Sequence, residues 1–370
     1  METEVRKMLL KDQLFNKENV TWLAKLIKGV YPALDSGEFV KDVLVKFPVL
    51  ELKERFFWIR EMIEKHLPAD YETTLKILLK SLDNSSVKSD FIFAAYSNYV
   101  AINGCSLKYL DISLNALGYF TEYCSAEFAI RSFINKFPDQ TFLKFNEWSK
   151  SKNDDQRRLA SEGLRPKLPW AVGINFDYKL GASVLDLLYY DKNRYVTRSV
   201  ANHLNDISKI DAAFVVEKLR KWKKFGQQNE KEMDYIIRHS LRTLIKRGDV
   251  AALKFLGFDF NAKVTVVGLG VVNSTVSLGQ KLEFYFDVVA EAACKLVIDY
   301  VVEYPSKTSR KSLKVFKIKT VSVTKGEVLH IEKKHLFRLM TTKKLYSGEH
   351  TLKVQINGKV MSAVKFELEV

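Results

Sequence analysis

The chain has 370 residues, of which 47% are hydrophobic and 28% are charged, as is typical of globular proteins with a sizeable core. Its formal net charge of +15 at pH 7 favours polyanionic partners, either nucleic acid or an anionic membrane surface. A generally basic soluble protein is the alternative. The three cysteines, Cys105, Cys124 and Cys294, are odd in number and show no CxxC spacing, which argues against a disulfide framework and a thiolate metal site.

The N-terminal residues lack the apolar segment of a signal peptide. No run of 18 apolar residues exists that would cross a membrane as a helix. Together with the cysteine usage, these features predict a protein of a reducing compartment, and we expect the cytoplasm.

The first part of the chain, up to about Phe260, has a helical pattern. Apolar residues recur at intervals of three and four, as in VYPALDSGEFVKDVLVKF and YETTLKILLKSL. Short breaks between these segments carry Pro, Gly, Asp or Asn. We therefore predict a helical domain over residues 1–260.

A repeat of 40 residues runs through the helical part. The segments QRRLASEGL, VTRSVANHL and IIRHSLRTL align so that Arg158, Arg198 and Arg238 are equally spaced. A period near 40 made of helix pairs is the signature of a HEAT-like α-solenoid. Equivalent positions recur along one face of such a stack, so the three arginines are expected to form a basic row on it. The alternative is that each arginine caps or bridges within its own repeat.

After Asn261 the apolar period changes to two. VTVVGLGVV, LEFYFDVV, CKLVIDYVVEY, SLKVFKIKTVSV, HTLKVQI and AVKFELEV alternate or nearly so, and turn sequences separate them. Several short strands in so few residues predict a small Ig-like β-sandwich over residues 261–370. The Cys…Trp…Cys core of antibody domains is absent, so this prediction rests on strand number and spacing.

The β part is the more densely basic one. Residues 262–370 hold 18 lysines and arginines against 10 aspartates and glutamates. KTSRKSLKVFKIK (307–319) and EKKHLFRLMTTKK (332–344) carry most of this surplus. Lysines that alternate along a strand either form a solvated face that resists aggregation or contact phosphates, and the sequence leaves both open.

Several familiar chemistries have no motif in this sequence. It contains no GxxxxGK[ST] phosphate loop, no GxSxG elbow and no HExxH, and its six histidines lack a metal-ligand spacing. An enzyme of this sequence is therefore expected to use neither a metal nor an organic cofactor. Carboxylates, aromatic residues and a basic surface remain as the candidate groups.

Four segments in order resemble one family. SAEFAIRSFI (125–134), RRLASEGLRPKLPW (157–170), YVTRSVANHLNDISK (195–209) and RHSLRTLIKRGDVAALKFLGF (238–258) are similar to the AlkC-type DNA alkylation-repair glycosylases. These are HEAT-like-repeat DNA glycosylases, and one branch carries a C-terminal Ig-like domain. The resemblance covers most of residues 90–260, whereas the first 90 residues match only in character.

The resemblance implies a monofunctional DNA glycosylase. Such enzymes hydrolyse the N-glycosidic bond of cationic alkylated bases, notably N3-methyladenine and N3-methylcytosine, and leave an abasic site. They are thought not to flip the lesion into a pocket, unlike glycosylases in general. The implied partner is double-stranded DNA containing alkylated bases, with the Ig-like domain closing around it. We expect a monomer without an obligate protein partner that associates with the nucleoid when bound to DNA.

Two glutamates in these motifs are the catalytic candidates. A cationic base is already a good leaving group, so no strong general acid is needed. A nearby carboxylate stabilises the oxocarbenium-like sugar and can orient the attacking water. Glu127 and Glu162 lie 35 residues apart, nearly one repeat, so they are expected to face each other from adjacent helix pairs. Glu127 has the alternative role of a first-turn acid after an N-cap at Ser125. The alternative role of Glu162 is an ion pair with Arg158, and such pairing does not exclude catalysis.

Aromatic and basic side chains near these motifs complete the predicted site. Trp170, after an LP turn, and Trp148 are candidates for lesion contact, because a Trp face attracts a cation. For Trp148 we favour core packing. The candidate DNA contacts are Arg158, Arg165, Lys167, Arg198, Asn202, Arg238 and Arg242.

Two other functions stay open from the sequence. Solenoids more often bind than react, so a non-catalytic HEAT-repeat DNA-binding or scaffold protein is the first alternative. A protein-binding solenoid with an Ig-like adhesion domain is the second. The three functions predict different results. A glycosylase releases free alkylated base, a non-catalytic DNA-binding protein shows salt-dependent binding without release, and a protein-binding solenoid shows no DNA binding.

Overall fold

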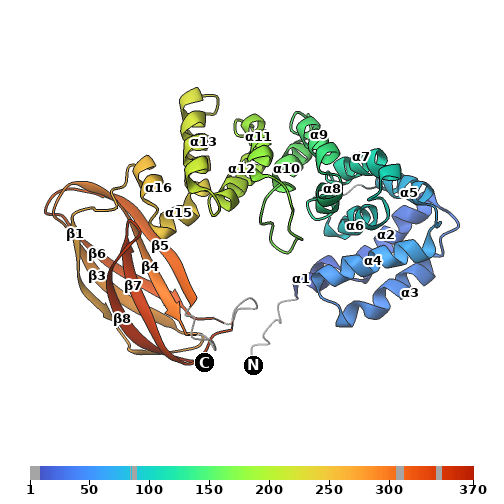
Figure 1. Cartoon of the computed structure of the whole chain (residues 1–370). Helices are drawn as coiled ribbons and strands as arrows, with labels where there is room; N and C mark the ends of the chain where they lie inside the picture. The colour runs from blue at the N-terminus through green and yellow to red at the C-terminus, as the bar shows by residue number, and fades with distance from the viewer. Residues whose placement is uncertain (1–8, 84, 86–89, 306–311, 339–343) are drawn as a thin grey trace. The chain divides into compact units, whose positions relative to one another are not determined.

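The computed structural model describes residues 9–83, 85, 90–305, 312–338 and 344–370 (Figure 1). Contacts divide the chain into two compact units. The helical unit contains the residues up to Ile207 together with Gly226–His239. The second unit contains Ser208–Phe225 and Ser240–Val370.

The helices and strands follow the two periods of the sequence. The last helix ends at Phe255 and the first strand begins at Val264, which confirms the predicted fold class of α-solenoid followed by β-sandwich. The α-helices in the described residues are α1 (Leu10–Leu14), α2 (Lys17–Val30), α3 (Ser36–Lys46), α4 (Leu52–His66), α5 (Tyr71–Asp83), α6 (Ala94–Asn103), α7 (Leu110–Phe120), α8 (Ile130–Lys136), α9 (Pro138–Trp148), α10 (Asp154–Glu162), α11 (Tyr178–Leu188), α12 (Arg194–Ile207), α13 (Ala212–Phe225), α14 (Glu230–Ser240), α15 (Arg242–Arg247) and α16 (Val250–Phe255). Short 3-10 helices span Phe47–Val49, Phe91–Phe93 and Leu107–Tyr109.

The helical unit is built in two layers, as a HEAT-like stack requires. Helices α4, α6 and α8 follow one another in one layer (Figure 1). In the same layer, α10 packs on α12. The other layer consists of α5, α7, α9 and α11. Arg158, Arg198 and Arg238 lie on α10, α12 and α14, so the 40-residue repeat corresponds to successive helices of the stack.

Helix α10 positions the predicted site, and its sequence defines both of its ends. Asn153 caps it by accepting hydrogen bonds from the backbone N–H groups of Asp155 and Gln156. Gly163 follows its last residue, and a Cβ there would come within 3.0 Å of Ile130 and Phe145. A glycine at this position therefore lets α10 pack closely against its neighbours.

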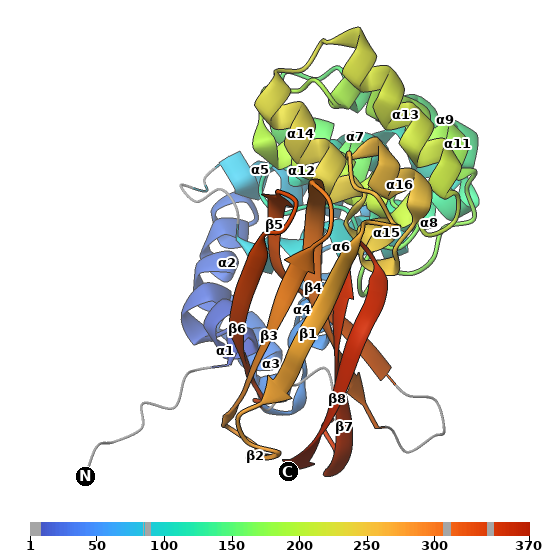
Figure 2. The ribbon, with the colours of Figure 1, turned by 90° about the vertical axis from the view of Figure 1, so that its left-hand side faces the viewer.

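The second unit contains a two-sheet sandwich. Its strands are β1 (Val264–Val271), β2 (Thr275–Ser277), β3 (Lys281–Ala290), β4 (Cys294–Tyr304), β5 (Ser312–Val323), β6 (Val328–Leu336), β7 (Gly348–Ile356) and β8 (Lys359–Glu369). One sheet has the order β1-β3-β6 and the other β2-β8-β7-β4-β5 (Figure 2). Apolar side chains of both sheets form one core. Leu253 of α16 and Phe258, which follows that helix, pack together with Val297 of β4. This contact explains why the second unit includes helices as well as strands.

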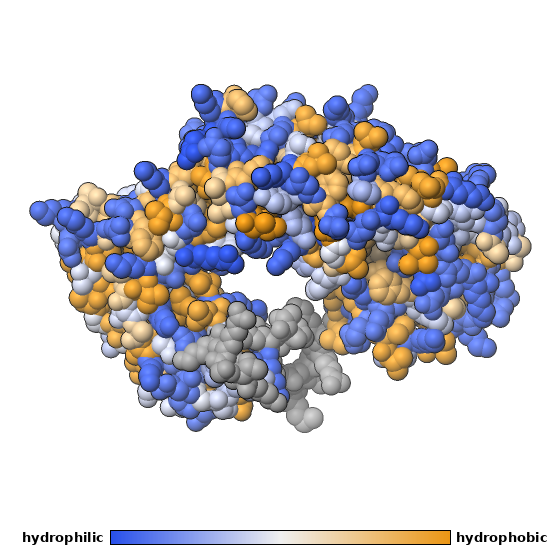
Figure 3. Space-filling model, viewed as in Figure 1, coloured by the Kyte–Doolittle hydropathy of each residue, from blue (hydrophilic) through white to orange (hydrophobic). Residues whose placement is uncertain are grey.

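The basic segments of this unit are only partly described. Residues 307–311 of the first segment and 339–343 of the second lie outside the described residues. Residues 312–319 form the first part of strand β5, and residues 332–336 form the last part of β6. Strand β6 was missed by the sequence pattern. In the view of Figure 3, hydrophilic side chains are spread widely over the visible surface, with apolar ones among them.

Asp299 in β4 predicts a pH-dependent stability. Its carboxyl is buried, and its Oδ2 has no hydrogen-bond partner among the described residues. Burial raises the pKa of Asp299 to about 6, although Lys246 and Lys317 oppose the shift. The folded protein holds this proton more tightly than the unfolded chain, so stability falls as pH rises from the ordinary pKa of 3.8 to about 6.

We therefore expect Asp299→Asn to raise the free energy of unfolding by about 1–3 kcal/mol above this pH window, and to leave it little changed below the window. Urea unfolding on both sides of the window measures the difference. An equal effect of the substitution at both pH values contradicts the assignment.

Candidate active site

Arg158 joins the two glutamates that the sequence singled out. Its guanidinium Nη1 lies 2.6 Å from Glu127 Oε2, and its Nη2 lies 3.7 Å from Glu162 Oε1. The Ser125 hydroxyl donates to the same Glu127 oxygen at 2.8 Å. Both carboxylates therefore face one cation, as expected of groups on adjacent repeats.

Glu127 and Glu162 differ in how completely they are bound. Both oxygens of Glu162 have partners: Arg165 Nη1 donates to Oε1 at 2.5 Å and the Ser199 hydroxyl donates to Oε2 at 2.5 Å. Glu127 makes its contacts through Oε2, and no partner of its Oε1 is found among the described residues. Its side chain is 15% exposed, against 6% for Glu162. Glu127 thus has one oxygen available for another group.

The position of Glu127 corrects the capping role considered for Ser125. Residues 127–129 form a turn, and α8 begins only at Ile130 with no side-chain cap at Ala129. Ser125 instead bonds the carboxylate of Glu127. Glu127 is therefore not a first-turn acid of α8.

Arg165 belongs to a buried ion network and not to the surface. It is 8% exposed, and besides Glu162 it bonds Asp206 Oδ2, 2.8 Å from its Nη2. Burial opposes its charge, but these two carboxylates raise its pKa. A buried guanidinium that is paired twice has no open face for a phosphate, so the expected DNA contact at Arg165 is corrected.

Arg158 is also held in place more firmly than a surface arginine. Its guanidinium carbon lies 5.1 Å from the centre of the Tyr195 ring, and its side chain is only 15% exposed. Burial opposes the charge, but Glu127 and Glu162 raise the pKa of Arg158. In this structure Arg158 organises the two carboxylates. Its shorter contact is with Glu127 of the adjacent repeat, so it bridges between repeats and not only within its own.

The other basic candidates are more accessible. Arg198, Arg238 and Lys167 are exposed, and Arg238 makes an ion pair with Asp234 across one turn of α14, 3.0 Å apart. Asn202 is half-buried, with its Oδ1 2.8 Å from His239 Nε2, and Arg242 is half-buried. The arginine row is therefore not uniform, because Arg158 is enclosed while Arg198 and Arg238 face solvent.

The two tryptophans have opposite environments. Trp148 is 2% exposed and packs on Phe145 and on Gly118, where a Cβ would lie 2.7 Å from the indole nitrogen. Lesion contact at Trp148 is thus corrected to core packing, the role favoured from the sequence. Trp170 is 71% exposed on the segment between α10 and α11.

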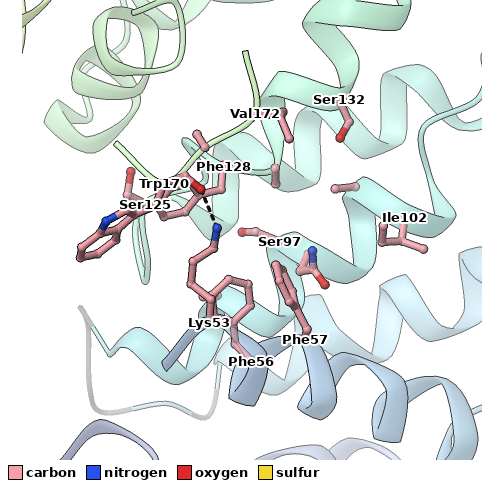
Figure 4. Close-up of a pocket in the computed structure, with 15 residues that line it drawn as sticks. Lys53, Phe56, Phe57, Ser97, Ile102, Ser125, Phe128, Ser132, Trp170 and Val172 are labelled. Carbon is pink, nitrogen blue, oxygen red and sulfur yellow. Dashed lines mark hydrogen bonds between the residues drawn. The ribbon is translucent and has the colours of Figure 1, made fainter. Parts of the chain in front are cut away.

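Two side chains that sequence reasoning missed hold the segment that carries Trp170. Arg131, fully buried on α8, donates to the carbonyls of Gly163, Arg165 and Val172 at 3.2, 2.9 and 2.5 Å. Burial and the nearby Arg165 charge lower the pKa of Arg131 to about 10. Lys53 Nζ donates to the Trp170 carbonyl at 2.5 Å (Figure 4). An arginine inside the apolar motif SAEFAIRSFI was the signal for Arg131, whereas nothing in the sequence pointed to Lys53.

The backbone of Trp170 is strained. Its φ of +64° lies in the left-handed region that bulky residues rarely adopt. Strain of this kind gathers at ligand-contacting sites, where surrounding contacts enforce it. The carbonyl bond to Lys53 is one such contact.

This strain predicts an unusual order of stabilities. Trp170→Gly relieves the backbone and Trp170→Ala does not, so we expect the glycine variant to unfold at higher urea, by about 1 kcal/mol. Lys167, exposed in the same segment and without a positive φ, is the control, because there alanine should be the more stable. The same order at both positions contradicts the strain argument.

Comparison with known proteins identifies the family. Residues 265–370 match the family described as the C-terminal Ig-like domain of the uncharacterised protein YhaZ. The uncharacterised protein YhaZ of Bacillus subtilis (strain 168) is 31% identical over 360 residues, covering 96% of this chain and 98% of that protein. The solved structure of the Pseudomonas fluorescens alkylpurine DNA glycosylase AlkC, bound to DNA containing an abasic site analog, is 35% identical with a TM-score of 0.88. It covers 98% of this chain and 100% of that one. The chain belongs to the AlkC family of DNA glycosylases.

Two further properties bear on this AlkC-family chain. In the part of the chain that the structure describes, no group of three or more His, Cys, Asp or Glu side chains is placed to hold a metal ion. Among the same residues, no helix has the length and apolar character needed to span a bilayer.

Proposed function

We propose that this chain is a monofunctional DNA glycosylase that excises cationic N3-alkylated bases, N3-methyladenine and N3-methylcytosine, from double-stranded DNA. The observation that carries the proposal is the pair of carboxylates held by Arg158, with Glu127 Oε1 available beside them. The family membership supports the same activity, because the AlkC structure holds DNA with an abasic site analog.

The chemistry needs little more than this pair. The lesion base carries a positive charge, so the bond from the sugar C1′ to the base nitrogen breaks with its electron pair going to the base, which leaves neutral. Positive charge then develops on the sugar, where a fixed carboxylate stabilises it. Glu127 Oε1 is assigned the role of holding the attacking water. The oxygen of this water bonds to C1′, and Glu127 accepts a proton from it.

The remaining groups position these atoms. Glu162, bound through both oxygens, is assigned a fixed negative charge beside the sugar and not proton transfer. Trp170 is assigned the contact with the cationic base from outside the helical stack, because its indole is exposed. This geometry favours excision without flipping the base into a pocket. The exposed cations Lys167, Arg198 and Arg238 are the proposed phosphate contacts.

Chromatography of the bases released from methylated duplex DNA tests the function. We expect free N3-methyladenine to appear in the presence of a chelator. Salt-dependent DNA binding without any released base favours the non-catalytic DNA-binding alternative instead, and absence of DNA binding at low salt favours a protein-binding solenoid.

A further inference from the structure

Trp170 is one of the residues that line a cavity of about 150 Å³ (Figure 4). The cavity is lined by residues of α4 and α6, by Ser125 and Phe128 from the segment before α8, and by the segment from Trp170 to Val172. Its walls are mainly apolar and include the rings of Phe56, Phe57 and Phe128. A cavity of this size with such walls is suited to a small aromatic ring. Ser125 links it to the proposed site, because its hydroxyl bonds the Glu127 carboxylate.

One of the residues that line the cavity, Ser97, carries a buried hydroxyl group. Ser97 is 3% exposed, and its hydroxyl has no hydrogen-bond partner among the described residues. A buried hydroxyl without a partner costs free energy, which a bound ligand with a suitable acceptor recovers. Lys53 also lines the cavity, and its ammonium supplies further donors. The ammonium lies 5.8 Å from the centre of the Phe57 ring and 5.7 Å from that of Phe128.

We infer that this cavity binds the released, neutral base after the glycosidic bond is broken, an inference that rests on the proposed function. The Lys53 charge repels an alkylated base while it is still attached and cationic. Hydrolysis leaves that base neutral, so the repulsion disappears. The ring nitrogens of the neutral base are then acceptors for Ser97 and Lys53. The Trp170 indole points away from the cavity (Figure 4), so it does not occupy the space that the base would fill.

Calorimetric titration of the full chain with free N3-methyladenine tests the inference without any catalysis. We expect one molecule of base to bind per chain. Ser97→Ala should weaken binding about tenfold, the effect of one lost hydrogen bond in a buried site. Phe57→Leu, which keeps an apolar wall but removes the aromatic face, should weaken it as well. The cationic nucleoside 3-methylcytidine should bind at least about tenfold less tightly than the neutral base.

Ser240→Ala is the matched control, because Ser240 is also buried, its hydroxyl has no partner in the part of the chain that the structure describes, and it does not line the cavity. No binding of free base, or binding that Ser97→Ala and Phe57→Leu leave unchanged, overturns the inference. Base release from methylated DNA by the same wild-type preparation reports separately on the proposed function. A preparation that releases base and fails to bind it contradicts only the cavity assignment.

Discussion

Glu127→Gln is expected to slow base excision about a hundredfold or more while DNA binding is retained, because glutamine cannot accept the proton of the attacking water. The substitution preserves the shape of the side chain, and its amide oxygen still accepts from Ser125 and Arg158. The charge of Glu127 is lost from a pair in which both side chains are only 15% exposed, so stability should fall by about 1–3 kcal/mol. Single-turnover excision from a duplex with one N3-methyladenine, together with a binding titration, measures both effects.

Glu147→Gln is the control for this substitution, since Glu147 is an exposed glutamate of α9 that pairs with Lys144 on the same helix. It should leave excision unchanged. Glu162→Gln should lower both the excision rate and the stability, because Glu162 is buried with Arg165 and Ser199. Full activity of Glu127→Gln in a folded protein contradicts the assignment of Glu127 as the proton acceptor.

Arg131→Leu should give the second large effect, a loss of stability of about 3–5 kcal/mol together with loss of excision. The substitution leaves the carbonyls of Gly163, Arg165 and Val172 without their donor in a buried place. The segment that carries Trp170 is then no longer fixed at both ends. Urea unfolding measures the stability, and limited proteolysis between residues 163 and 177 reports the release of the segment.

Arg131→Lys separates the charge from the geometry. A lysine keeps a cation on α8 but lacks the planar fork that reaches several carbonyls at once, so we expect an intermediate loss. The proposed role of Arg131 is excluded if Arg131→Leu has the wild-type free energy of unfolding and its Trp170 segment is as resistant to protease as in the wild type.

Much of this architecture was predictable because the periods of apolar residues report packing directly. The change from three-to-four spacing to alternation near Phe260 located the end of the helices, and the 40-residue repeat of Arg158, Arg198 and Arg238 identified the stack. Strand β6 was missed because charged side chains, including Lys333 and Lys334, occupy positions along this edge strand. Its basic character obscured its alternation.

The roles of individual arginines were not predictable from the sequence. Arg158, Arg165 and Arg198 belong to similar basic motifs, yet the first organises two carboxylates, the second is buried between Glu162 and Asp206, and the third faces solvent. Burial depends on which helix packs on which, and a residue type does not encode it. The approach of Glu127 to Glu162 was foreseen from their spacing, whereas the free oxygen on Glu127 required coordinates.

The most direct test of the account is the fate of a duplex with one N3-methyladenine after incubation with the wild-type chain. We predict that the free base is released and that the strand breaks at the lesion only after alkali, as expected for an abasic site left by a monofunctional glycosylase. An intact duplex without any alkali-sensitive site, under conditions where the chain binds it, would contradict the account.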